Sequence, residues 1–494
     1  MIRLRRITIA AGVAVTALVT SAHVGSPDTW FAGNAGPYPI RVLVRSPGVI
    51  PGLADVTVWA PAEGVRSVWA TPAYFNAGDR GLPPADTAKV VEGRPGTYAV
   101  QLWIMIPGSY SIRVSVDGEQ GTSTAIVPVS AVATEVREMD PRLGLVLAGL
   151  GLVLLAGLVT IVGAATRESV LPPGVEADPR RRRRALLAMG ITGLALAGAL
   201  WGGKAWWDAE DRAYRRGLAQ QWRVQTTLLN QGGESRLRVT ISDSIWRERR
   251  VTPLVPDHGK LMHLFLSSED GDAFAHLHPV SVDSSNFEAA LPLLPAARYR
   301  VFADITHESG FARTMVGTVT LPEPSSPAKA LDPDDGWRVG PADERTGRLS
   351  DGSTVSWAGP DTLRVNEDAG LRFAVREADG SSARVEPYLG MPGHAVVMQQ
   401  DGGVFIHLHP MGTISAAAQV LLTERVESDT ARGALGRRLT EAGAFTRHAG
   451  HETTLPGTFE FPYAFPDTGT YRVWVQVRRK GKIETAAFKA SVVE

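Results

Sequence analysis

The sequence contains no cysteine among its 494 residues. That absence excludes disulfides, thiolate nucleophiles, zinc ribbons and blue-copper centres, because each of them requires a cysteine sulfur. Neither sign of charge is in excess, since 51 basic residues balance 51 acidic ones. The balance gives no reason to expect nucleic acid or an acidic polymer as a partner. Phosphate loops, nucleotide fingerprints and nucleophile triads are also missing from the sequence, which lowers the rank of most enzyme classes.

Long apolar runs are few, and their positions predict a membrane topology. Met1–Ala22 carries three arginines, then an apolar stretch and small residues, which is typical of a signal peptide. A retained anchor is the alternative, although the apolar part is short for a span. Residues 143–165 and 185–206 are long enough to cross a bilayer as helices. The loop between them, 166–184, ends in five arginines and is expected to stay in the cytoplasm.

This topology places the regions before and after the two spans together on the outer side of a cell membrane. The abundance of glycine (51) and proline (33) is typical of short strands joined by turns. Alternating apolar and polar runs predict an all-β protein with three Ig-like β-sandwich domains, interrupted in the middle of the chain by the two transmembrane helices. The predicted domains cover residues 23–139, 222–321 and 336–494, with a proline-rich and serine-rich linker at 322–335.

The third predicted domain carries an insertion at about 411–455. Its segment 414–438 has a helix-like pattern, and the insertion is either a lid or a decorated loop.

Two copies of a histidine motif are the most informative feature. The middle domain contains His263, then Asp-Gly seven and eight positions later, and finally His276-Leu-His278-Pro. The last domain repeats this spacing with His394, Asp-Gly, and His407-Leu-His409-Pro. Six of the eleven histidines lie in these two units.

The spacing predicts a hairpin in each unit, with Asp-Gly at the turn. A two-residue turn places His263 opposite His278, whereas a four-residue loop places it opposite His276. In both registers the three histidines share one face, because strand side chains alternate with period two. The intervening Ala275 and Leu277 then face the domain core. Imidazoles on opposed and diagonal positions can converge on one ion.

The sequence therefore predicts metal ligation by His263, His276, His278, His394, His407 and His409. Hydrogen-bonded core histidines or strand-surface histidines are the structural alternative. Three imidazoles suit copper or zinc, and thioethers near the motifs favour copper, Cu(I) in particular; these are Met262, Met391, Met398 and Met411. His448 and His451 could add a ligand, but a solvated loop is the favoured interpretation. His258 and His307, as single histidines, are expected at the surface.

A further candidate depends on processing. Cleavage after Ala22 would make His23 the mature N-terminus, whose amine and ring could chelate copper, as in the copper-resistance β-sandwiches and copper monooxygenases that this arrangement resembles. Residues 24–257 contain no second histidine, so the first domain lacks the usual partner.

The middle unit, with Lys260-Leu-Met-His263-Leu-Phe-Leu and Phe274-Ala-His-Leu-His278-Pro, resembles secreted bacterial domains of the YtkA-like group. That resemblance covers about residues 222–321, with 336–494 as a diverged second copy. It implies an Ig-like sandwich linked to copper handling, with the motif histidines as metal ligands. The third domain has Met-Pro-Gly before its first histidine, so its ligand set need not be identical.

The function expected from the sequence is a membrane-anchored, extracytoplasmic copper-binding protein for capture, relay or resistance, without catalysis. Its partners would be the metal ion, the membrane and a copper enzyme or transporter. A zinc-dependent hydrolase or hydratase is the second hypothesis. The sequence offers no clear general base for it, and Asp304 and Glu308 are the candidates. An adhesion or assembly module without metal is the third.

Overall fold

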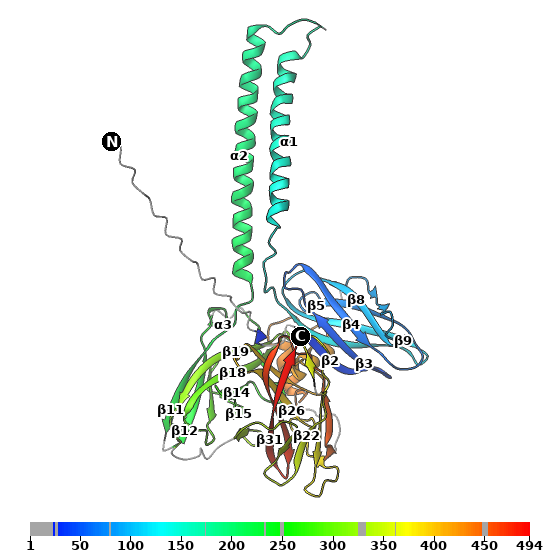
Figure 1. Ribbon diagram of the computed structural model, residues 1–494, viewed down its shortest axis with the longest axis vertical. Coiled ribbons are helices and arrows are strands. Elements are labelled where there is room, and N and C mark those ends of the chain that lie inside the picture. Colours follow the sequence, from blue (N-terminus) through cyan, green and yellow to red (C-terminus); the bar gives the residue numbers. More distant parts are fainter. Residues whose placement is uncertain are drawn as a thin grey trace, which may run out of the picture.

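The computed structural model describes residues 23–24, 28–78, 81–172, 174–231, 234–247, 251–324, 332–360, 362–446 and 453–494. The predicted signal peptide, Met1–Ala22, lies outside these residues, as do His448 and His451. The described strands form seven sheets, and two long helices rise from them in the middle of the chain (Figure 1). The protein is thus mostly β-structure with two apolar helices, as the sequence predicts.

The first β region has two sheets with a shared hydrophobic core. Alternate residues of each strand face that core, for example Val42 and Val44. One sheet has the order β2 (Asp28–Ala35), β3 (Tyr38–Arg45), β4 (Gly52–Trp59), β8 (Thr97–Ile104) and β7 (Lys89–Val90). The other has the order β10 (Gly121–Ala131), β9 (Gly108–Gly118), β5 (Val65–Tyr74) and β6 (Asp86–Thr87).

Two long helices follow, α1 (Pro141–Glu168) and α2 (Pro179–Gly217). Each begins after an aspartate that caps backbone N–H groups and is followed by proline, which is a favoured helix start. Both are long and apolar enough to cross a membrane, and most of their apolar side chains are exposed. They approach closely at Gly163, where an added Cβ would lie 2.5 Å from the sulfur of Met189.

The helix ends differ from the sequence prediction. Arg180–Arg184 belong to the first turns of α2 rather than to a loop, and α2 continues well beyond residue 206. The hydroxyl of Tyr214 donates to the carbonyl of Glu135 (3.1 Å) and accepts from the N–H of Ile50 (3.3 Å), and these bonds attach the end of α2 to the first β region.

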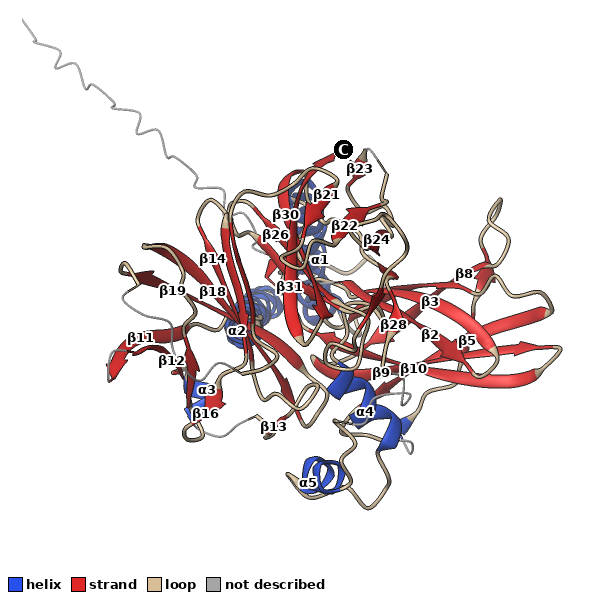
Figure 2. Cartoon of the chain, turned by 90° about the horizontal axis from the view of Figure 1, so that it is seen from below, coloured by secondary structure: helices blue, strands red, loops and turns tan. Residues whose placement is uncertain are grey.

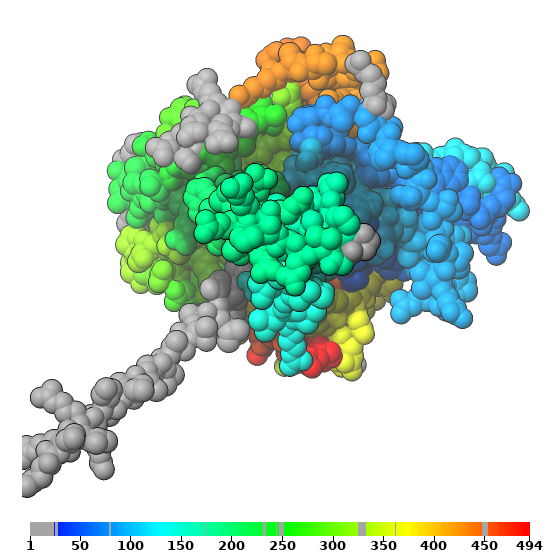
Figure 3. Space-filling view, turned by 90° about the horizontal axis from the view of Figure 1, so that it is seen from above, coloured from blue at the N-terminus to red at the C-terminus, as the bar shows by residue number. Residues whose placement is uncertain are grey.

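All three β regions lie at one end of the helix pair (Figure 1). A view along the helices shows the first region (blue) on one side and the second (green) on the other (Figure 3).

The second β region again has two sheets around one core. One sheet has the order β11 (Val224–Gln231), β12 (Glu234–Ile241), β17 (Asn286–Ala290) and β16 (Val280–Ser281). The other has the order β13 (Leu254–Val255), β18 (Ala297–His307), β14 (His263–Ser268), β15 (Ala273–Leu277) and β20 (Gly336–Val339), with β19 (Ala312–Leu321) also paired to β18. A short helix, α3 (Ser244–Arg247), precedes β13. Strand β20 starts at the predicted boundary of the third domain, yet it pairs with β15 of the second region.

The third β region completes the fold with a core of its own. Its larger sheet has the order β1 (His23–Val24), β27 (Val404–Leu408), β26 (His394–Gln399), β30 (Gly469–Arg479), β31 (Lys482–Val493) and β23 (Leu363–Arg364). Its second sheet has the order β21 (Thr346–Arg348), β22 (Thr354–Trp357), β24 (Leu371–Arg376) and β29 (Thr458–Phe461), and a small pair comprises β25 (Arg384–Val385) and β28 (Leu455–Pro456).

The insertion of the third region contains two helices rather than one continuous stretch over 414–438. These are α4 (Ala416–Glu424) and α5 (Ala434–Glu441), which lie outside the sheets (Figure 2). Helix α4 packs against β10 and β18, and α5 packs against β13. The insertion therefore connects all three β regions.

The second and third regions meet sheet to sheet. Every residue of β14 and β15 is buried, because one face covers the core of the second region and the other faces the third region. A separate apolar cluster fills this interface, with Phe265, Phe274 and Phe302 on one side and Phe405 and Trp474 on the other. Phe302 and Phe405 stack with centroids 3.9 Å apart. The faces that carry the motif histidines are therefore turned toward each other.

Candidate metal centre

Strands β14 and β15 form the hairpin that the first motif predicts. Leu264 pairs with Leu277 and Phe265 with His276, and this register places His263 opposite His278. This is the register predicted for a two-residue turn, but four residues, 269–272, join the strands. The N–H of Gly271 donates to the carbonyl of Ser268 (2.9 Å), and Gly271 has a φ of 75° that favours glycine. Ala275 and Leu277 belong to the core of the second region, as predicted.

Strands β26 and β27 repeat this arrangement in the third region. Ala395 pairs with Leu408 and Val396 with His407, which places His394 opposite His409. Ile406 and Leu408 face the core of the third region. All six motif histidines are buried.

The first motif forms a compact group, here called the first triad: His263, His276 and His278. One nitrogen from each ring lies within 4.8 Å of the other two. The Nε2 of His263 lies 3.3 Å from the carbonyl oxygen of Asp257, and the Nδ1 of His276 lies 2.8 Å from the Oε1 of Gln476. Both partners are acceptors, because the amide nitrogen of Gln476 donates to Thr485. These two ring nitrogens therefore carry the protons.

The remaining nitrogens of His263 and His276 face each other. The Nδ1 of His263 and the Nε2 of His276 are 3.1 Å apart, and neither has a proton to donate in the neutral rings. Two opposed lone pairs at this distance repel unless a cation lies between them. Two nitrogens that each lie about 2.0–2.1 Å from one tetrahedral ion are roughly 3.3 Å apart. The observed spacing fits a metal ion.

His278 is oriented by a carboxylate. The Oδ1 of Asp335 accepts from the Nδ1 of His278 (3.0 Å) and from its backbone N–H (2.8 Å). The Nε2 of His278 is buried and has no hydrogen-bond partner among the described residues. A carboxylate that fixes the tautomer and leaves the other nitrogen free is a common support for a metal-bound histidine.

Replacing Asp335 by Asn is therefore expected to weaken copper binding at the first triad by about 10- to 100-fold. Asparagine keeps the shape but loses the negative charge that holds the Nδ1 proton. A competition titration of the full-length protein measures this change. Asp379→Asn, at an exposed turn, is the matched control. Equal affinities for the two variants would contradict the role given to Asp335.

The second group of converging nitrogens, here called the second triad, consists of His258, His394 and His409. The prediction had His407 in place of His258, which it expected at the surface. That expectation is wrong for His258, whose side chain is 7% exposed, and for His307, which is buried. His258 lies in the left-handed region at the turn before β14 (φ 51°), which turns it toward the third region. Its ring centroid is 5.6 Å from His394 and 5.2 Å from His409.

His394 lacks hydrogen bonds to the described residues at both of its ring nitrogens. Both of its ring nitrogens are buried, and neither has a hydrogen-bond partner in the described part of the chain. The Nδ1 of His409 donates to the carbonyl of Ile414 (3.0 Å), which leaves its Nε2 buried and unpaired among the same residues. A buried polar atom without a partner costs free energy, so these nitrogens indicate a ligand.

His407 lies between the two triads. Its ring centroid is 4.5 Å from His409 and 5.3 Å from His263. Its Nδ1 is 3.7 Å from the Oδ2 of Asp304, and its Nε2 is buried without a hydrogen-bond partner among the described residues.

Burial keeps these imidazoles neutral. Desolvation, followed by the neighbouring histidines, holds the pKa of His263, His276, His394 and His407 well below the ordinary value. Burial also lowers the pKa of His409. Asp257 behaves differently: burial raises its pKa, but the N–H of Ala417 donates to its carboxylate (2.9 Å), and the pKa is lowered overall. The centre thus combines neutral ring nitrogens with an ionised carboxylate, which is the form that binds cations.

A cavity of about 590 Å³ reaches the centre from the side of the helices. It is lined by His263, His407 and His409, by Asp257 and Asp304, and by the segments that precede α1 and follow α2. Burial raises the pKa of Asp304 to about 7, although a hydrogen bond from Thr314 opposes the shift. Small ions and molecules can therefore approach the histidines through this cavity.

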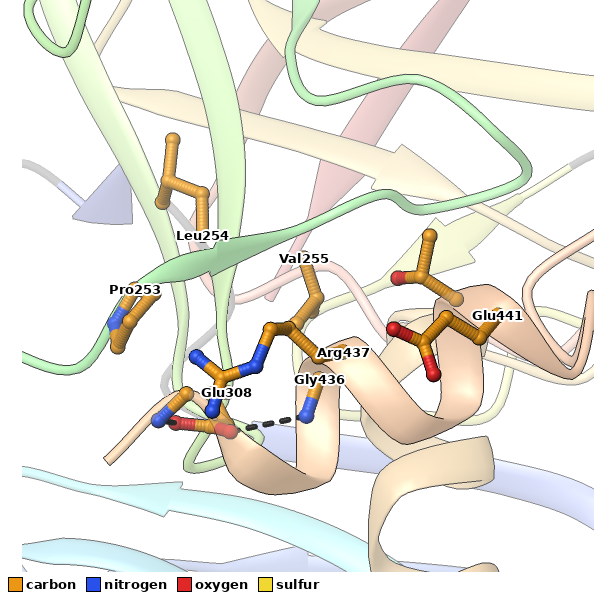
Figure 4. A pocket seen from close by; sticks show the side chains of 9 residues that line it. Pro253, Leu254, Val255, Glu308, Gly436, Arg437 and Glu441 are labelled. Atoms are coloured by element: carbon orange, nitrogen blue, oxygen red, sulfur yellow. Dashed lines mark hydrogen bonds between the residues drawn. The ribbon is translucent and has the colours of Figure 1, made fainter. Parts of the chain in front are cut away.

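Glu308, the other carboxylate considered as a base, serves the insertion instead. It accepts from the N–H of Gly433 (2.6 Å) and of Gly436 (2.8 Å) at the start of α5. Figure 4 shows this carboxylate among the residues that line a separate pocket of about 300 Å³, beside Val255 and Arg437. Glu308 is absent from the lining of the larger cavity.

Three of the four thioethers near the motifs pack in hydrophobic cores or clusters. Met262 belongs to the core of the second region, Met398 to the apolar cluster between the regions, and Met411 packs on the core of the first region. The donors that converge at the triads are imidazoles, and these three thioethers give no support for copper.

The chain matches the family described as "Domain of unknown function (DUF8832)" over residues 217–323 and 348–494. The matched segments contain the seven histidines of the centre. No curated protein sequence matches the chain significantly.

Three solved structures show distant likenesses to the chain. A tetra-tandem repeat from the extending region of a large adhesion protein is 11% identical, with a TM-score of 0.16, and the alignment covers 90% of this chain and 71% of that one. Salmonella alpha-2-macroglobulin reacted with methylamine is 8% identical, with a TM-score of 0.18, and 97% of this chain covers 24% of its length. A putative membrane-anchored protein from Corynebacterium diphtheriae is 8% identical, with a TM-score of 0.14 and 94% coverage of both chains. The chain thus spans about a quarter of the macroglobulin.

Proposed function

We propose that this chain, which belongs to the DUF8832 family, is a membrane-anchored extracytoplasmic metal-binding protein that captures and relays copper. The observation that carries the proposal is the pair of facing lone pairs on His263 and His276, 3.1 Å apart inside a buried triad. Imidazole donors without thiolate suit copper or zinc, and the resemblance of the motif to YtkA-like domains favours copper.

The geometry supports capture and relay rather than permanent storage in a closed site. Each triad supplies three nitrogens, so a bound ion would keep a coordination position for exchange. The cavity gives that position a path to the outside at the base of the helix pair. A membrane-bound copper transporter or copper enzyme could exchange the ion there. Transfer of this kind needs only ligand exchange.

A titration of the full-length protein in detergent or nanodiscs, with copper or zinc and a competing chelator, tests this function. We expect tight copper binding that is lost when all six motif histidines are replaced by alanine. His307→Gln, which changes a buried histidine outside the centre, is the matched control and should bind copper as the wild type does. Weak binding that survives the sixfold replacement would end the proposal.

The topology is part of the same proposal. The three β regions would be Ig-like sandwiches on the outer side of the membrane, and residues 169–178 would face the cytoplasm. Because the chain has no cysteine, a single introduced one reports on its side without background. In intact cells, an impermeant maleimide should label Ser281→Cys and should reach Val175→Cys only after permeabilisation; both positions are exposed. Labelling in the opposite order would contradict this orientation.

A zinc-dependent hydrolase or hydratase is the second candidate. The observation that favours it is the cavity of about 590 Å³, where Asp304 lies beside His407 in reach of a small substrate. A zinc-bound water at a three-histidine site can act as a nucleophile, and a nearby carboxylate can accept its proton. Zinc-dependent hydrolysis of a simple ester or hydration of CO₂, abolished by Asp304→Asn, would favour this candidate over copper relay.

A further inference from the structure

The two repeat units contact each other through equivalent residues. In β18, Asp304 pairs with His263, and in β30, Gln476 pairs with His394, so the two polar residues occupy matching positions. Each reaches across the interface to the second histidine of the other unit. Gln476 accepts from His276 (2.8 Å), and Asp304 lies 3.7 Å from His407.

The turns are matched in the same way. Arg472 of β30 donates to the carbonyl of Asp270 (3.2 Å) and to the carboxylate of Asp272 (2.9 Å) at the first Asp-Gly turn. Arg300, at the equivalent position of β18, packs on Gly402 of the second turn. The two hairpins are therefore docked as a pseudo-symmetric pair, and this docking fixes the distance between their histidines.

The distances between imidazole ring centroids are no larger between the two repeat units than within them. The ring centroid of His407 lies 5.3 Å from His263 and 5.3 Å from His276, whereas His263 and His276 are themselves 5.3 Å apart. His394 and His407, in one unit, are separated by 5.4 Å. The seven histidines of the centre thus form one continuous cluster in which neither hairpin holds an isolated set.

The second triad crosses the interface. Two of its members, His394 and His409, come from the third region, and His258 comes from the second. The third region alone therefore cannot complete this triad, which exists only when the two regions are docked.

From these contacts we propose that the two triads form a single interdomain centre that holds two copper ions as an interacting pair, with the ring of His407 between them. This inference rests on the proposed copper-binding function and deepens it. The negative charge of nearby carboxylates offsets the repulsion between two cations at such close range. Asp257 contacts the second triad and Asp335 the first, so one carboxylate adjoins each ion.

Electron paramagnetic resonance of the full-length protein tests the pairing, with cupric ion as the probe. Total copper is measured by mass spectrometry, and the spin signal is integrated for protein loaded with one or two equivalents. Two cupric ions that share the ring of His407 as a bridge couple antiferromagnetically, so we expect the second equivalent to lower the integrated spin to less than half of the bound copper. His258→Ala should bind one ion and show its full spin.

Two bound ions with full spin intensity would overturn the paired centre while leaving copper binding intact. The absence of tight copper would overturn both the pairing and the proposed function. His307→Gln is again the control, since it removes an imidazole outside the cluster and should reproduce the wild-type spin loss.

Discussion

Replacing His394 by leucine is expected to stabilise the metal-free protein while it removes the second ion. Both ring nitrogens of His394 are buried without a hydrogen-bond partner among the described residues. Leucine has a similar volume and no polar atom, so the substitution removes the cost of the two desolvated nitrogens. That cost is about 1–3 kcal/mol for each unpaired buried group. Most substitutions of buried residues destabilise the folded protein, so a gain in stability would be a specific result.

The matched control is His276→Leu. The Nδ1 of His276 donates to Gln476 and also lies 3.2 Å from the hydroxyl of Tyr388. Leucine at this position would leave the Oε1 of Gln476 buried without its donor, so this variant should be destabilised. Thermal unfolding of both full-length variants in the presence of a chelator measures the difference. A loss of stability for His394→Leu as large as that for His276→Leu would contradict the assignment of His394 as a ligand.

Acid is expected to destabilise the metal-free protein as the pH falls below about 6.5. Burial lowers the pKa of His307 to about 4, with a smaller opposing effect from the carbonyl of Thr252. The unfolded chain therefore binds a proton at this residue at a higher pH than the native protein does. The stability that depends on neutral His307 is present above pH 6.5 and is lost as the pH falls toward 4. The loss approaches about 3 kcal/mol for this residue.

The histidines of the centre add to this acid sensitivity in the same direction, because burial lowers their pKa as well. Chelator-treated protein should therefore unfold at a much lower denaturant concentration at pH 4.5 than at pH 7. In His307→Gln, the free energy of unfolding should fall less between pH 7 and pH 4.5 than it does in the wild type. The difference should be nearly the whole contribution of His307. Stability that stays constant over this pH range would contradict the neutral, buried state of these rings.

The local features of the site could be predicted from the sequence. The alternation of side chains fixes which residues share a face, and the observed register, with His263 opposite His278, is one of the two that the sequence allows. The apolar partners, such as Leu277 and Leu408, face their cores for the same reason. The two long apolar segments also indicate helices, although α2 runs to Gly217 because its polar end is itself a good helix former.

The docking of the two hairpins could not be predicted in this way. It depends on Phe265, Phe405 and Trp474, which in the sequence look like ordinary core residues. Without the docking, His258 has no visible partner, and the second triad appears to need His407. One signal was present: His258 lies only five residues before His263, so a turn between them keeps it near the hairpin. The role of Asp335 beside His278 could not be predicted either, because Asp335 lies in the segment that was expected to be a linker.

X-ray absorption at the copper edge of the loaded, full-length protein is the most direct test of the central claim. We predict a first shell of nitrogen at about 2.0 Å, the outer-shell scattering of imidazole rings and no sulfur. Those features should disappear together with the bound copper when the six motif histidines are replaced. A shell of sulfur, or of oxygen without imidazole scattering, would contradict a centre built from the two histidine hairpins.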